Sequence, residues 1–143
     1  MAKRILVPLG PRDDAESLIP LVADLARGAG ATVRLLHVAP TPENRIGEYG
    51  RIVVFASQER ERLEARGHDH LAAVGWPLEG AAVEHRVRFG GLAEETVLEA
   101  DVFGADLIAL GARRRRWWRS LAVGRTARRI ARRAAASVLV LAC

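Results

Sequence analysis

"VRFGGLAEETVLEADVFGADLIALGA", residues 87–112, contains in one stretch the alternation of elements that decides the fold. It starts within an alternating apolar run that predicts a strand over residues 83–89. Gly90 and Gly91 then turn the chain into a segment with apolar residues at helical spacing, and the apolar run 105–112 predicts a buried strand. Two strands joined through a helix are parallel, because parallel neighbours need a crossover connection.

The same alternation continues on both sides of this unit. The predicted strands outside it cover residues 4–9, 32–40 and 137–143, and the predicted helices cover residues 14–28, 49–74 and 124–133. Five strands alternating with four helices predict an α/β fold, with a doubly wound parallel sheet and helices on both faces. At 143 residues the chain is expected to form a single domain over residues 1–143.

Composition excludes several classes of protein. No apolar run reaches the roughly 18 residues that span a bilayer, and the N-terminus lacks the apolar core of a signal peptide. We therefore expect a soluble, cytoplasmic protein. The one cysteine, Cys143, excludes an intrachain disulfide and metal sites built on cysteine pairs.

Charge is divided unevenly along the chain. Residues 1–110 hold 12 lysines and arginines and all 17 acidic residues, a formal charge of −5. Residues 111–143 hold ten arginines and no acid, a formal charge of +10. This asymmetry favours an anionic partner for the C-terminal quarter.

The four histidines do not indicate a metal or a catalytic site. His68 and His70 are two apart on a predicted helix and point away from each other, which disfavours metal binding. His37 and His85 fall in predicted strands, where hydrogen-bonded structural histidines are expected. No serine–histidine–aspartate order or other catalytic motif is found, so we expect the protein not to be an enzyme.

Four segments together carry a resemblance to a known family. "KRILVPLG", "GATVRLLHVAP", the stretch 87–112 and "GRTARRIARRAAASVLVLA" resemble, in this order, segments of the universal stress protein family. The resemblance implies a Rossmann-like sheet of strand order 3-2-1-4-5, a homodimer and a role in stress response. In one branch it also implies an adenine nucleotide, such as ATP, in the crevice between the first and fourth strands.

In that branch, the sequence after the fourth strand resembles G-x2-G-x9-G-[S/T], and an aspartate follows the first strand. Gly111 and Gly124 match the first and third glycines, whereas Arg114 stands at the second glycine and Arg125 at the Ser/Thr. Gly10 stands at the aspartate position. The candidate ligand site implied by the resemblance comprises Pro8, Leu9, Gly10, Val38, Gly111, Arg114, Gly124, Arg125 and Thr126.

These departures change how a phosphate could be bound. Arg114 cannot offer the close backbone approach that glycine allows, but guanidinium groups bind phosphate through paired hydrogen bonds. A helix expected to begin near Gly124 would add the positive end of its dipole. ATP or another adenine nucleotide is therefore a candidate ligand, and no cofactor is required.

The loop expected after the fourth strand admits several readings. Arg113–Arg116 and Arg119 are compatible with a solvated loop, whereas Trp117 and Trp118 favour packing on the body or in an oligomer interface. Stacking on nucleic-acid bases and contact with a membrane surface are less favoured, since the resemblance includes no nucleic-acid module. Farther along, a stripe of four arginines is expected to face solvent and pair with acids: Arg128, Arg129, Arg132 and Arg133.

The last predicted strand indicates an oligomer. In the order implied by the resemblance, the apolar segment Ser137–Leu141 lies at a sheet edge, whose unpaired backbone groups invite pairing with a second copy. The favoured function is a dimeric regulatory module that binds a nucleotide or another anion. The alternative is a ligand-free interaction protein whose arginine–tryptophan loop fills the crevice and docks a partner protein. Weak ATP hydrolysis and nucleic-acid binding rank lower.

Overall fold

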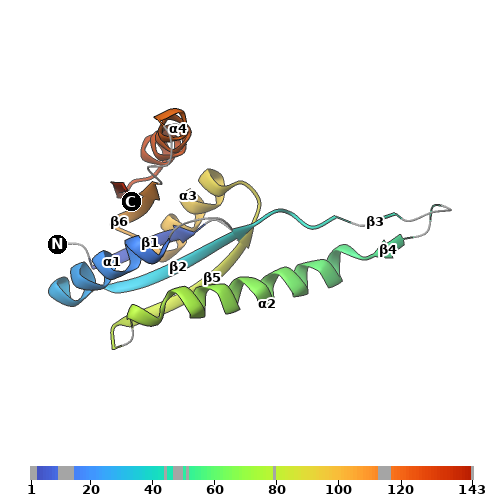
Figure 1. Cartoon of the computed structure of the whole chain (residues 1–143), viewed down its shortest axis with the longest axis horizontal. Coiled ribbons are helices and arrows are strands. Elements are labelled where there is room, and N and C mark those ends of the chain that lie inside the picture. The colour runs from blue at the N-terminus through green and yellow to red at the C-terminus, as the bar shows by residue number, and fades with distance from the viewer. Residues whose placement is uncertain are drawn as a thin grey trace.

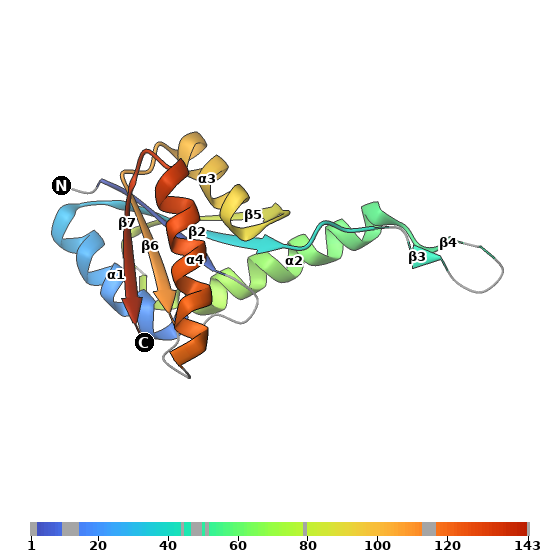
Figure 2. The ribbon, with the colours of Figure 1, turned by 90° about the horizontal axis from the view of Figure 1, so that it is seen from above.

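Five parallel strands form one sheet with helices on both faces in the part of the chain that the structure describes (Figures 1 and 2). The structure is a computed structural model, and it describes residues 3–9, 15–43, 45–46, 50, 52–78, 80–112 and 117–142. The strands of the sheet are β1 (Arg4–Leu9), β2 (Thr32–Ala39), β5 (Ala82–Phe89), β6 (Leu107–Ala112) and β7 (Ser137–Ala142). Their order is β5-β2-β1-β6-β7, which confirms the expected order 3-2-1-4-5.

Helices connect these strands and divide the core into two layers. The helices are α1 (Ala15–Ala29), α2 (Ala56–Val74), α3 (Leu92–Phe103) and α4 (Trp117–Arg133), and a short 3-10 turn, η2 (Trp76–Leu78), follows α2. Alternate residues of β1 point to opposite faces, so Ile5 and Val7 pack with residues of α1 and α2, whereas Leu6 packs with residues of α3 and α4. No helix of the described residues is both long enough and apolar enough to cross a membrane.

The starts of β1 and β6 are tied together by one carboxylate. Asp106 accepts hydrogen bonds from the backbone N–H groups of Lys3, at 2.8 Å, and Arg4, at 3.3 Å. Just before it, Gly104 ends α3 in the left-handed conformation, with φ of 69°, which favours glycine. The first strand is thereby anchored beside a strand about a hundred residues later in the sequence.

A buried ion cluster joins α3 to β2 and β5. The side chain of Glu99 is fully buried and accepts hydrogen bonds from Arg34 of β2, at 2.6 Å, and Arg88 of β5, at 2.7 Å. Arg34 also bonds Glu84, and Arg88 bonds Glu95. Arg86 of β5 lies 3.7 Å from the same carboxylate. The glutamate is therefore paired with three cations, as a buried charge requires.

The segment between β2 and α2 differs from the sequence prediction. A helix was expected over residues 49–74, but α2 begins at Ala56 and follows a short antiparallel pair, β3 (Arg45–Ile46) and β4 (Ile52–Val54). Two physical reasons are the β-branched run of β4, which favours extended backbone, and Gly50, whose φ of 71° turns the chain. The pair projects beyond the sheet as an arm (Figures 1 and 2).

Candidate functional site

The carboxyl ends of β1, β2 and β6, the three inner strands, lie side by side at one end of the sheet. β1 pairs with β2 up to Leu9 opposite His37, and with β6 through Ile5–Leu107 and Leu6–Ile108. Since β6 and β2 lie on opposite sides of β1, the winding direction reverses here, and ligands of doubly wound sheets bind at such points.

Residues from all three strand ends lie at this end of the sheet, but on different faces of it. Leu9 is 1% exposed and Val38 is 5% exposed. Gly111 is half-buried beside α1, and a Cβ added there would lie 3.7 Å from Leu18, an ordinary contact. Leu9 and Gly111 face α1, whereas Val38 belongs to the cluster that packs against α3 and α4. Pro8 is buried one residue before Leu9. The structure thus brings the candidate residues of three strands to the same end of the sheet.

The structure corrects the expected position of the C-terminal half of the motif. A helix was expected to begin near Gly124, but α4 begins at Trp117, so Gly124, Arg125 and Thr126 lie inside it. At about 1.5 Å per residue, Gly124 is about 10 Å from the first residue of α4. Interior N–H groups bond carbonyls of the preceding turn, so these residues offer no helix N-terminus to a phosphate. A single glycine costs a helix only about 1 kcal/mol, which explains why the helix continues through it.

The remaining motif residues fall outside the described part of the chain. Gly10, Arg114 and the rest of Arg113–Arg116 are not among the described residues. Trp117 and Trp118 form the first turn of α4 instead of belonging to a loop, but their side chains also lie outside the description.

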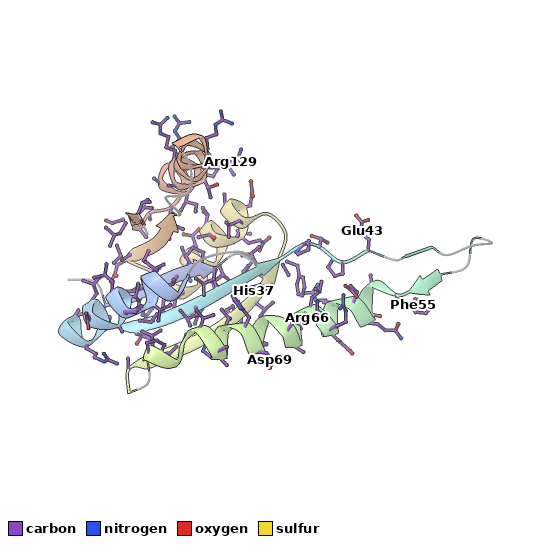
Figure 3. The ribbon with its side chains drawn as sticks, in the orientation of Figure 1. His37, Glu43, Phe55, Arg66, Asp69 and Arg129 are labelled. Carbon is purple, nitrogen blue, oxygen red and sulfur yellow. The ribbon has the colours of Figure 1, made fainter. Side chains whose placement is uncertain are left out.

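The outer surface of α4 carries a cluster of five arginines. A groove of about 380 Å³ is lined by Arg125, Arg128, Arg129, Arg132 and Arg133. All five are exposed. Figure 3 shows α4, with Arg129 labelled, on the opposite side of the sheet from α2. The predicted solvent-facing stripe is confirmed, and Arg129 pairs with Glu94 at 3.5 Å, as expected of its pairing with acids.

A second groove, of about 590 Å³, follows the edge strand β5 and was not identified from the sequence. Its lining includes Arg60, Glu64 and His68 of α2, together with His85–Phe89 of β5. The guanidinium of Arg60 lies 4.6 Å from the centre of the Phe89 ring. The periodicity of α2 and β5 could have placed these residues on facing surfaces, but not their distance.

His37 and His70 correct one expectation about the histidines. Their ring centres are 5.6 Å apart, between β2 and α2, where Figure 3 labels His37. His37 was expected to be hydrogen-bonded, but its buried Nδ1 has no hydrogen-bond partner in the described part of the chain, and neither has Nε2 of His70. Burial, together with the charge of His70, lowers the pKa of His37 below its ordinary value.

The described residues do not form a metal site. No group of three or more His, Cys, Asp or Glu side chains within the described ranges is arranged to hold a metal ion.

Comparison with known proteins gives the family. The family model described as "Universal stress protein family" matches residues 1–142. No curated protein sequence matches the chain significantly.

Solved structures of low sequence identity share the fold. The chain is similar to a universal stress protein from Archaeoglobus fulgidus, with a TM-score of 0.66 and 22% identity over 96% of this chain and 92% of that one. It is also similar to the A. fulgidus protein in complex with dAMP, with a TM-score of 0.65 and 22% identity over 96% of each chain. A third, a universal stress protein in complex with cAMP, has a TM-score of 0.63 and 17% identity over 99% of this chain and 97% of that one. The match of the family model over nearly the whole sequence, on a sheet of the expected strand order, establishes that this chain belongs to the universal stress protein family.

Proposed function

We propose that this protein is a non-catalytic regulatory module that binds an adenine nucleotide at the carboxyl ends of β1, β2 and β6. The observation that carries the proposal is the position of Leu9, Val38 and Gly111 at the ends of β1, β2 and β6, where the winding of the sheet reverses. Two proteins of the same fold have been solved with dAMP and cAMP. The nucleotide would bind beyond these strand ends.

Side chains, not a glycine-lined loop, are proposed to bind the phosphates. Gly124 and Arg125 lie inside α4, where their backbone N–H groups belong to the helix. Arg114, at a glycine position of the motif, would supply the guanidinium that pairs with a phosphate.

Calorimetric titration with ATP, ADP and AMP tests this site, with Arg114→Gly as the variant. We expect heat of binding and a rise in melting temperature for the native chain, since a ligand that binds only the folded state stabilises it. Weaker binding by Arg114→Gly would show that the side chain is a ligand. Arg66→Gln, an exposed arginine of α2, is the control and should bind normally.

The second candidate is a ligand-free interaction module, and the position of the motif's last residues in the interior of α4, away from its N-terminus, favours it. It predicts no heat and no change in melting temperature at millimolar nucleotide. That result would contradict the nucleotide proposal. Stronger nucleotide binding by Arg114→Gly would show instead that the arginine occupies the crevice.

We further propose that the module acts as a cytoplasmic homodimer in stress response. β7 is an edge strand, and Val140 on it is 43% exposed, which supports pairing with a second copy. The absence of catalysis is tested by incubating the protein with ATP. Product formation above the buffer rate, abolished by Arg114→Gly, would contradict it.

A further inference from the structure

The arginine face of α4, formed by Arg125, Arg128, Arg129, Arg132 and Arg133, is not used by the proposed nucleotide site. Helical periodicity explains its position, because Ala127 and Ile130 point into the core and direct the arginines outward. At about 1.5 Å per residue the face extends about 12 Å along the helix from its first arginine to its last.

The described residues neutralise little of this charge. In the described residues the ion pair recorded for the face is Arg129–Glu94 at 3.5 Å, with side chains 61% and 48% exposed. Such an exposed pair contributes about 0–1 kcal/mol and does not hold the arginine away from a ligand. The face also belongs to a segment, residues 111–143, with ten arginines and no acid. A polyanion would therefore meet guanidinium groups that are already exposed.

The composition of the face discriminates between classes of polyanion. Among the described side chains of α4, Ala131 is the apolar residue exposed between these arginines, and its methyl group is too short to insert into lipid. Protein interfaces are usually centred on aromatic or large apolar anchors, and the five arginines include none. Base stacking with a single strand requires aromatic rings, and the five residues include none.

We propose that the arginine face of α4 binds the phosphate backbone of double-stranded nucleic acid, independently of base sequence. A basic stripe along a helix, in a chain with a pI of about 10.8, is the electrostatic pattern of such binders. Nucleic acid ranked low from the sequence because no known module was found. The face gives the protein a site that needs no such module, since guanidinium groups pair with phosphate oxygens directly.

Fluorescence anisotropy with a labelled DNA duplex of about 20 base pairs tests the proposal, with salt varied between about 50 and 200 mM. The affinity should be in the non-specific range, about 1–100 μM, and should fall steeply with salt. In Arg128→Gln/Arg132→Gln the slope of log K against log salt should decrease by about 2, because two phosphate contacts are lost. The affinity should fall by about tenfold or more at about 0.1 M salt.

Two further variants control for charge and for folding. Lys3→Gln/Arg66→Gln removes the same net charge at exposed positions outside α4 and should leave the slope unchanged. Arg128→Lys/Arg132→Lys keeps the charge and should keep most of the slope. All variants should melt within a few degrees of the native chain, since the changed side chains are exposed.

Several outcomes would overturn the proposal. One is a salt slope in Arg128→Gln/Arg132→Gln equal to that of the native chain, and another is an equal loss in the control with Lys3 and Arg66 changed. Binding to vesicles with anionic phospholipid, or to a polyglutamate peptide, in the absence of duplex binding would assign the face to a membrane or an acidic protein. An ATP titration of the same variants tests the nucleotide site separately. A failure to bind ATP would contradict the proposed nucleotide site and would leave the prediction of duplex binding intact.

Discussion

Glu99 shows how one buried residue joins a helix to two neighbouring strands of the sheet. Its carboxylate pairs with Arg34 and Arg88, which come from neighbouring strands, while its own helix lies on the face shared with α4. We expect Glu99→Ala to lower the free energy of unfolding by about 3–5 kcal/mol, because two partly buried guanidinium groups lose their partner. Urea unfolding measures this change. Glu61→Ala, at an exposed position of α2, should lower the free energy of unfolding by less than about 0.5 kcal/mol. An equally small loss in Glu99→Ala would show that the ion cluster does not stabilise the fold.

His37 makes the stability depend on pH. Its pKa is lowered in the folded protein by burial and by His70, whereas in the unfolded chain the pKa returns to about 6.5. Below that pH the unfolded chain binds the proton first, so the free energy of unfolding should fall as the pH is lowered from about 6.5 to the folded pKa. Above about 6.5 this contribution is fully present.

Chemical denaturation between pH 8 and pH 5 measures this dependence. His37→Leu should reduce the fall in stability, because the group that resists protonation is removed. His68→Gln, at an exposed position of the same helix as His70, should retain the fall. A fall that is unchanged in His37→Leu would assign the pH dependence to other groups.

At the scale of elements, two glycines in helices have opposite surroundings. A Cβ at Gly67 of α2 would lie 2.8 Å from Val87 and 2.9 Å from His37, so α2 approaches the sheet closely there. At Gly28 of α1 a Cβ would meet nothing within 4 Å. Gly67→Ala should therefore destabilise the protein by about 1–3 kcal/mol through overpacking. Gly28→Ala should stabilise it by about 0.4–1 kcal/mol through helix propensity.

Thermal and urea unfolding of these two variants test the packing of α2 on the sheet. Stabilisation by both substitutions would show that α2 lies farther from β2 and β5 than the structure places it.

Most elements could be predicted because their signal is local. Apolar runs, helical spacing and glycine turns identified the five strands of the sheet, and their order followed from the family resemblance and is confirmed. The beginning of α4 could not be predicted, since Gly124 reads as a boundary although a helix tolerates one glycine. The pair β3–β4 was missed because its strands have two and three residues, too few for a clear period.

The positions of the candidate site residues could be predicted, whereas contacts between residues far apart in the sequence could not. Leu9, Val38 and Gly111 were placed by the resemblance, and the structure puts all three at strand ends. The pairing of Glu99 with Arg34 joins residues 65 apart, and neither residue type nor spacing reveals it. The groove of the arginine face likewise requires knowing which side of α4 is covered by the core.

For the whole molecule, the exposed edge at β7 is the feature most open to test. Val140→Lys should weaken a dimer formed through this edge, since a charged side chain on an edge strand opposes pairing. Sedimentation or light scattering across a concentration series measures the oligomeric state. Val102→Lys is the control, because Val102 of α3 is 67% exposed and does not lie at this edge. A native chain that remains monomeric, or equal dissociation of both variants, would remove β7 as the interface.

The central place of β1 has a consequence for how the chain folds. β1 precedes the other strands of the sheet in the sequence, yet its start bonds a residue 103 positions later through Lys3 and Asp106. Contacts of such sequence separation form slowly, since a long loop must close before they contribute. A nascent chain can thus assemble β1, β2 and β5 with α1 and α2 first. One side of β1 then stays unpaired until β6 has been synthesised.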